Sequence, residues 1–141
     1  MVTIRIANPS DIETLVSLDP LSRTNKRRIP FINQAVNSGT CHLLESNGRI
    51  VGYGVLSYAF YQYGFVELLY VHSDFRRKNL ATRLMNHFEA ICTTEKLFTS
   101  TNKSNIPMQR LLESIGYQPS GVIENLDEND PELVYIKRLA C

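Results

Sequence analysis

The chain has 141 residues, of which 43% are hydrophobic and 21% are charged, enough for a compact domain with its own core. Its formal net charge of +1 gives no general reason to expect nucleic-acid binding. The sequence contains neither a long apolar run typical of a membrane span nor the apolar segment of a signal peptide. We therefore expect a cytoplasmic protein in which residues 1–141 form a single domain.

The cysteines Cys41, Cys92 and Cys141 are odd in number and widely spaced, and none belongs to a Cys-x-x-Cys pair. This spacing argues against a disulfide framework and against a zinc site. We therefore predict no bound metal.

The N-terminal segment predicts a strand followed by a helix. Residues 2–6 alternate apolar and polar side chains, as a half-buried strand does. Ser10 and Glu13 have the spacing of a capping box, and the helix that they introduce is expected to end at Asp19.

A second helix is expected next, because apolar residues from Ile29 to Val36 recur at helical spacing before a stop at Gly39. Four cations lie between Arg23 and Arg28, just before this helix. They fit either a mobile lid over an anionic ligand or a solvated helix face.

Two hairpins should follow. Strands are expected over residues 41–44 and 50–58, with a turn at Asn47-Gly48 between them. A second turn is expected within residues 58–64, which are rich in aromatic side chains. Those aromatics suit the wall of a ligand pocket, a dimer contact or ordinary packing on the sheet.

The central stretch of the chain combines a strand, a basic turn and a helix. Residues 65–71 form an apolar, strand-like run, and an apolar helical repeat extends over residues 80–91. Between them lie three consecutive cations, residues 76–78, followed by Asn79, which tolerates a left-handed conformation. Because helix N-termini carry free N–H groups and a positive dipole end, this turn predicts an anion site.

The remaining residues predict a strand over 96–101, a helix that begins near Pro107 and ends at Gly116, and two final strands. The final strands are expected over residues 117–124 and 133–139. The connection between them is strongly acidic, which fits attraction of a cationic amine or a solvated hairpin loop.

The order strand, Arg76-x-x-Asn79-x-Ala81, helix resembles the acyl-CoA motif of the GNAT N-acyltransferases, which usually have glycine where this chain has Asn79. The segment from Asn105 to Tyr117 resembles a second feature of that family, in which the fifth strand is followed by an asparagine, a helix and a glycine–aromatic pair like Gly116-Tyr117. The expected element order, βααβββαβαββ, is also the family's. The resemblance implies an α/β (α+β) fold with a mixed, mostly antiparallel sheet of about seven strands and four helices.

The resemblance also implies acetyl-CoA, or another acyl-CoA, as co-substrate. The main chain of the central strand should pair with the pantetheine arm, and the amides of the basic turn should hold the pyrophosphate. The predicted cofactor-binding residues are Leu69, Val71, Arg76, Arg77, Lys78, Asn79, Leu80, Ala81, Thr82 and Asn105.

Acyl transfer to an amine needs a base, and Glu67 is the candidate because a carboxylate is out of place in a buried strand. The alternative for Glu67 is a pair with a surface cation. His72 is a second possible base, on the opposite face of the strand by alternation. The backbone N–H of Val71 would meet the developing oxyanion.

The general acid is less clear, because Leu112 stands where many relatives carry a tyrosine. Solvent can protonate the leaving thiolate, or another hydroxyl can. The available hydroxyls belong to Tyr70, Tyr117 and Ser104, and we take Tyr117 as the candidate catalytic residue.

The predicted function is N-acetyl transfer from acetyl-CoA to a primary amine, on a small molecule or a peptide, by direct transfer in a ternary complex. The alternative is a non-catalytic CoA-binding or protein-interaction module on the same fold. Neither nucleic acid nor a membrane is expected as a partner. Both a monomer and a homodimer are compatible with the sequence.

Overall fold

A computed structural model describes residues 1–76 and 78–139. In these residues the strands form a seven-stranded sheet in the order β1-β2-β3-β4-β5-β7-β6, accompanied by four α-helices. The predicted mixed α/β fold and its element order are thereby confirmed. The chain divides into two compact units, residues 1–56 with 68–86 and residues 57–67 with 87–141. That the whole chain acts as a single domain stays a prediction.

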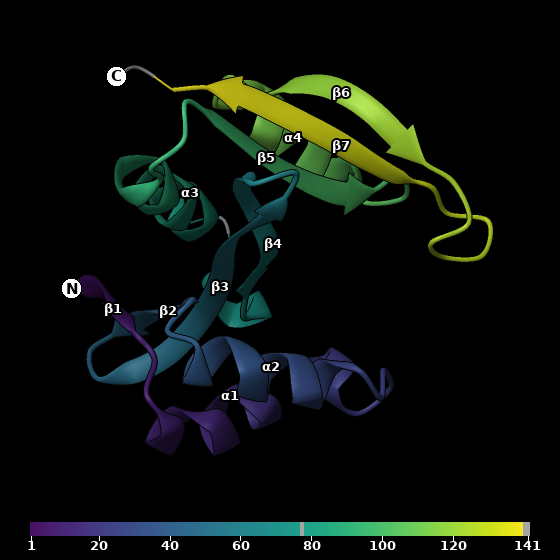
Figure 1. Cartoon of the computed structure of the whole chain (residues 1–141). Coiled ribbons are helices and arrows are strands. Elements are labelled where there is room, and N and C mark those ends of the chain that lie inside the picture. The colour runs from purple at the N-terminus through teal and green to yellow at the C-terminus, as the bar shows by residue number, and fades with distance from the viewer. Residues whose placement is uncertain (77, 140–141) are drawn as a thin grey trace. The chain divides into compact units, whose positions relative to one another are not determined.

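The first unit buries its core between two helices and the sheet, as Figure 1 shows for α1 and α2 beside β2 and β3. Leu15, Ile32, Leu43 and Tyr53 are fully buried there. The elements that contribute to this unit are β1 (Val2–Ile6), α1 (Ile12–Leu18), α2 (Arg28–Asn37), β2 (Cys41–Ser46), β3 (Arg49–Phe60), β4 (Tyr63–Val71) and α3 (Leu80–Ile91).

The second unit contains the other ends of β3, β4 and α3 together with the C-terminal elements. These elements are β5 (Lys96–Asn102), α4 (Ile106–Ser114), β6 (Gln118–Ile123) and β7 (Glu132–Arg138). Strand β4 pairs with β5 in parallel, at Gly64 to Val66, whereas β5, β7 and β6 pair antiparallel. Figure 1 shows β5, β7 and β6 side by side.

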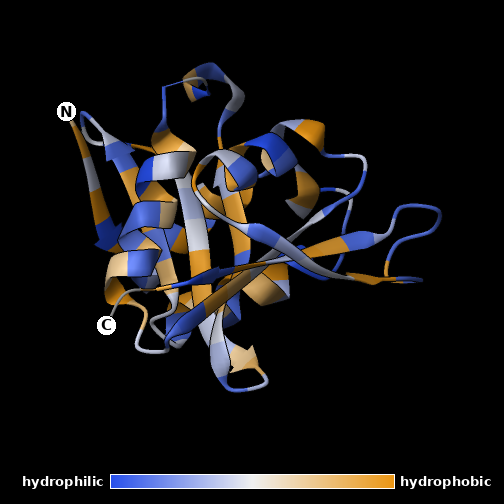
Figure 2. Ribbon diagram, turned by 90° about the horizontal axis from the view of Figure 1, so that it is seen from above, coloured by the Kyte–Doolittle hydropathy of each residue, from blue (hydrophilic) through white to orange (hydrophobic). Residues whose placement is uncertain are grey.

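The two hairpin turns form where the sequence predicts them. Asn47 and Gly48 have φ values of 52° and 82°, and Tyr61 and Gln62 have 54° and 70°. Positive φ at both central residues is typical of the two-residue turns that join neighbouring strands. The β6–β7 connection is largely hydrophilic, as Figure 2 shows by colour.

The predicted capping box at Ser10 and Glu13 is wrong. Asn8 is the capping residue: its side chain accepts from the Ser10 N–H, and the Asp11 carboxylate accepts from the Asn8 N–H. A 3-10 turn at Pro9–Asp11 therefore precedes α1. Pro9 favours this earlier start, because its fixed φ and missing N–H suit the first position of a helical turn.

The second helix begins at Arg28 and buries Ile32, Ala35 and Val36. Ile29 belongs to the predicted apolar face but is 40% exposed. Gly39 has a φ of 75°, which agrees with the predicted stop. None of the helices in residues 1–76 and 78–139 is long and apolar enough to cross a membrane.

Candidate functional site

The C-terminal end of β4 is anchored on β3 within the first unit. The backbone N–H of His72 donates to the Val51 carbonyl at 2.8 Å. A Cβ added to Gly52 would lie 2.6 Å from the Tyr70 carbonyl oxygen and 3.3 Å from the Val71 Cα. Gly52 thus permits a close backbone approach that any side chain would block.

Aromatic rings contact two cations of the turn that follows β4, Arg76 and Lys78, and also Arg49 at the start of β3. The Arg49 guanidinium lies 5.2 Å and the Lys78 ammonium 5.3 Å from the centre of the Phe75 ring. The Arg76 guanidinium lies 5.6 Å from the centre of the Tyr70 ring. These distances are within the range of about 6 Å for cation–π contacts, which orient the cations without neutralising their charge.

Asn79 adopts the left-handed conformation that the sequence predicts for it, with a φ of 60°. Its carbonyl accepts from the Arg83 N–H at 3.0 Å, so α3 begins directly after it. The amides of Leu80, Ala81 and Thr82 therefore lie in the first helical turn, where N–H groups have no helical acceptor. No acidic residue occupies this turn.

This set of donors fits the phosphates of acetyl-CoA. In the described residues Arg76 and Lys78 have no carboxylate partner. These cations and the free amides meet at one positive helix end, which favours a polyanion. The structure brings together Leu69, Val71, Arg76 and Lys78–Thr82 of the predicted cofactor set in the first unit. Arg77 lies outside the described residues.

Arg76 also makes a contact that the sequence does not indicate. Its Nε donates to the Val71 carbonyl at 2.8 Å. This bond fixes the turn against the end of β4. It also uses a main-chain group that the family resemblance assigns to the pantetheine arm, so the pairing of Val71 stays a prediction.

Glu67 is exposed on β4, although the sequence predicts a carboxylate in a buried strand. Among the described residues it has no ion-pair partner. An exposed, unpaired carboxylate is free to accept a proton from an amine directly or through water. Its role as the base stays a prediction.

His72 has its Nδ1 occupied, because this nitrogen accepts from the Asp74 N–H at 3.1 Å. The neutral ring then carries its proton on Nε2. Accepting another proton at Nδ1 would break the cap on the 3-10 turn Ser73–Phe75. This geometry disfavours His72 as the base.

Tyr117 is buried in the second unit, and its hydroxyl donates to Glu89 Oε2 at 2.9 Å. Lys137 also donates to this carboxylate, at 3.0 Å. Burial, and then the Glu89 charge and hydrogen bond, raise the pKa of Tyr117. A general acid must release its proton, so this setting is unfavourable for the acid role, which stays a prediction.

The other residues considered for proton transfer or cofactor binding have structural contacts of their own. The Ser104 hydroxyl donates to Asp130 Oδ2 at 2.6 Å, and the Asn105 side chain caps α4 by accepting from the Met108 N–H. Leu112 is 1% exposed and packs as a core residue. A role for Asn105 in cofactor binding stays a prediction.

The acidic β6–β7 connection is tied to the loop before α4. Asp127 accepts from the Asn102 side chain at 2.8 Å, and Asp130 accepts from the Ser104 N–H at 3.0 Å. These bonds shape the loop and use part of its acceptor capacity. Fewer carboxylate oxygens of the loop therefore remain to bind a cationic amine than its composition indicates.

The described residues contain no group of three or more histidine, cysteine, aspartate or glutamate side chains that could hold a metal ion. Cys41 and Cys92 are free thiols. Burial, and to a smaller extent the charge of Asp11, raise the pKa of the Cys41 thiol to about 12. Cys41 is therefore a protonated core residue at neutral pH.

Comparisons with known proteins assign the fold to one class, the acetyltransferases. The model of the acetyltransferase (GNAT) family matches residues 10–117. The chain belongs to this family, as its sequence motifs predict. No curated protein matches the chain.

Solved structures resemble the chain over nearly its whole length. A GNAT-family acetyltransferase from Bacillus cereus is 29% identical with a TM-score of 0.90, covering 100% of this chain and 99% of its own. Ard1 from Thermoplasma volcanium is 19% identical with a TM-score of 0.87, covering 99% of both chains. An N-acetyltransferase from Staphylococcus aureus is 18% identical with a TM-score of 0.81, again covering 99% of both.

Sequence reasoning missed the supporting residues of the site. Arg49 and Phe75 are distant along the chain and carry no motif, so no pattern connects them. The signal that was present is the glycine at position 52 within a strand-like run, because an isolated strand glycine indicates a close backbone approach.

Proposed function

We propose that the chain transfers an acetyl group from acetyl-CoA to a primary amine of a small molecule or a peptide, within a ternary complex. The observation that supports this most strongly is the basic turn after β4. There, Arg76 and Lys78 lie on aromatic rings beside the first turn of α3. Membership of the GNAT family supports the same chemistry.

Bound acetyl-CoA supplies an acetyl group activated as a thioester. Arg76, Lys78 and the amides of residues 80–82 would hold its phosphates, because they offer positive charge and free N–H donors together. The backbone of β4 at Leu69 would orient the arm as an added strand. In this arrangement the chain contributes positioning more than covalent chemistry.

Glu67 is proposed as the base. A protonated amine is not a nucleophile, so the acceptor must lose a proton before it attacks a carbonyl carbon. The exposed carboxylate of Glu67 can accept that proton. The group that leaves is a thiolate, and because the pKa of its thiol is about 8.5, solvent can protonate it without a dedicated side chain.

The test of the base is Glu67→Gln, assayed at saturating acetyl-CoA with an amine that the parent protein acetylates. We expect the rate constant to fall by about 10²-fold or more, with the acidic limb of the pH profile altered, because a general base acts only in its deprotonated form. Glu13→Gln is the control, because Glu13 is also exposed and lies on α1. An unchanged rate and pH profile in Glu67→Gln would remove Glu67 from the mechanism.

A non-catalytic CoA-binding or protein-interaction module is the second candidate. Two observations favour it: Leu112 is buried where many relatives have a tyrosine, and the Tyr117 hydroxyl is engaged by Glu89. This candidate predicts saturable acetyl-CoA binding with no transfer to any member of an amine panel. The free thiols of Cys41 and Cys92 agree with the reducing cytoplasm proposed for either function.

A further inference from the structure

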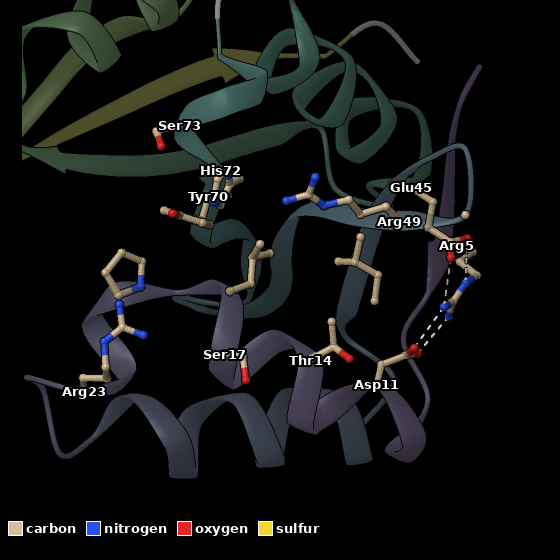
Figure 3. A pocket seen from close by; sticks show the side chains of 14 residues that line it. Arg5, Asp11, Thr14, Ser17, Arg23, Glu45, Arg49, Tyr70, His72 and Ser73 are labelled. Carbon is tan, nitrogen blue, oxygen red and sulfur yellow. Dashed lines mark hydrogen bonds and ion pairs between the residues drawn. The ribbon is translucent and has the colours of Figure 1, made fainter.

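A cavity of about 720 Å³ lies within the first unit, in addition to the basic turn (Figure 3). Its walls come from α1, the 3-10 turn Pro20–Ser22 and the residue after it, the β2–β3 turn and the end of β4. Ligand pockets commonly have volumes of about 300–1,000 Å³. The size of this cavity therefore suits a small molecule.

Both carboxylates of the cavity wall are paired with the same arginine. Arg5 Nη1 lies 2.8 Å from Asp11 Oδ2, and Arg5 Nε lies 3.0 Å from Glu45 Oε1. Figure 3 shows Arg5 bonded to Asp11 at one side of the cavity. One arginine thus engages both acidic groups that line the cavity.

Two further arginines of the wall keep their charge uncompensated. In the part of the chain that the structure describes, neither Arg23 nor Arg49 has a carboxylate partner. Arg49 is oriented by the Phe75 ring at 5.2 Å and extends over the cavity toward His72 in Figure 3. With three arginines and two acidic residues, the wall has a net charge of +1 with His72 neutral.

Hydroxyl groups complete the polar lining. Thr14, Ser17, Tyr70 and Ser73 line the cavity, and their hydroxyls have no side-chain partner among residues 1–76 and 78–139. Each hydroxyl can donate to an oxygen of a ligand. Leu18, Pro20 and Ile50 add an apolar portion to the wall.

We propose that this cavity is a binding site for a small molecule that carries a carboxylate or phosphate group, held by Arg49 and Arg23. Guanidinium groups match both anions by paired N–H···O bonds, and the free hydroxyls supply further donors. The site goes beyond the proposed acetyl transfer and does not require it. The anion belongs to a separate small molecule, and occupation by a CoA phosphate reaching from the neighbouring turn is the result that would contradict this.

Anion binding is measured on the intact chain by titrating inorganic phosphate, and separately succinate, while recording ¹H–¹⁵N spectra. We expect saturable shifts at Gly48 and Ser73, two residues of the wall. Arg49→Met and Arg23→Met should each weaken binding about tenfold, because each removes a charge-assisted contact while keeping a long apolar side chain. Arg27→Met is the matched control, since Arg27 is exposed in the same cationic segment but does not line the cavity.

Repeating the titration with saturating CoA identifies the source of the anion. Unchanged probe affinity supports a site for a separate small molecule, whereas loss of probe binding would assign the cavity to a CoA phosphate and overturn the proposal. The proposal is overturned if neither probe gives saturable shifts, or if Arg49→Met and Arg23→Met bind the probes as the parent does. Because no acetyl transfer is measured, a failure here is separate from a failure of the proposed activity.

Discussion

Asp19 secures the connection between α1 and α2. This residue is 1% exposed, and its Oδ2 accepts from the Tyr53 hydroxyl at 2.5 Å and lies 3.3 Å from Arg28 Nη1. The other oxygen, Oδ1, accepts from the Leu21 N–H at 3.0 Å. A single buried carboxylate thus accepts from or pairs with groups of a strand, a helix and the 3-10 turn Pro20–Ser22. It should therefore contribute more to stability than an exposed ion pair does.

Asp19→Asn should lower the free energy of unfolding by about 2–3 kcal/mol, because Arg28 and Tyr53 lose their charged acceptor. Urea unfolding measures this change. Asp74→Asn is the control, since the Asp74 side chain is 73% exposed and its 3.8 Å contact with His72 is weak; it should cost little. Equal, small losses in the two variants would show that the Asp19 network is not a stabilising one.

The ionisation of Asp11 should make the free energy of unfolding depend on pH. The hydrogen bond from Arg5 is the largest of the causes that hold the pKa of the Asp11 carboxyl below its usual range. Because this pKa is lower in the folded than in the unfolded chain, ionised Asp11 stabilises the fold above about pH 4. The contribution disappears as the pH falls through the folded-state pKa.

Asp11→Asn should therefore be less stable than the parent at about pH 7, and the difference between the two should shrink as the pH falls below about 4. Unfolding by urea at a series of pH values measures the difference. Asn keeps one oxygen that can accept from the Asn8 N–H, but its NH2 group replaces one of the two oxygens that accept from Arg5, so the substitution removes the charge and one acceptor. A difference that stays constant over this pH range would contradict the account.

At the scale of elements, the turn between β4 and α3 depends on a backbone conformation that few residues tolerate. Asn79 has a φ of 60°, which costs an ordinary L-residue about 1–2 kcal/mol. Asn79→Ala should lower the free energy of unfolding by about 1 kcal/mol and weaken acetyl-CoA binding. Asn79→Gly should retain both, because glycine has no such cost.

Urea unfolding and calorimetric titration with acetyl-CoA, applied to the same two variants, measure these effects. Alanine is the informative change, since it removes the side chain while retaining a Cβ. If Asn79→Ala matched the parent in both measurements, the left-handed turn would not be what shapes the site.

The strands, helices and turns were predictable because each depends on local patterns. Apolar periodicity located the helices with Ile32 and Leu84 in their cores, and Asn47-Gly48 located a hairpin turn. The cap of the first helix was not predicted correctly. Both Asn8 and Ser10 are suitable capping residues, and the Asp11 carboxylate decides between them through a bond that spacing alone does not specify.

At the scale of the whole chain, the residues of the cofactor turn could be predicted from the sequence, whereas the residues that contact the turn from distant parts of the chain could not. Arg76, Lys78 and Asn79 are consecutive or nearly so, so a short motif contains them. The contact between Arg49 and Phe75 and the bond between Tyr117 and Glu89 join residues far apart in sequence. Such contacts depend on tertiary packing, which periodicity does not encode.

The acidic connection between β6 and β7 illustrates the same limit. Its composition suggested attraction of a cationic amine, whereas Asp127 and Asp130 accept from Asn102 and Ser104. By contrast, the cavity near Arg23 and Arg49 retains free positive charge. Charged groups that are used in internal contacts are not available to a ligand. Composition alone therefore overestimates the charge that a segment can offer.

The measurement that most directly tests acetyl-CoA binding at the basic turn is thermal unfolding with and without excess acetyl-CoA. A ligand at about 100 times its Kd adds about 2.7 kcal/mol to stability, which should raise the Tm by several degrees. The test variant combines Arg76→Met with Lys78→Met. The control combines Lys26→Met with Arg27→Met and removes the same charge from exposed residues before α2.

We predict a rise in Tm for the parent and the control that is lost or strongly reduced in the test variant. That result would locate the phosphates of the co-substrate at the turn between β4 and α3. No rise in the parent, or an equal rise in all three proteins, would contradict the proposal that this turn binds acetyl-CoA.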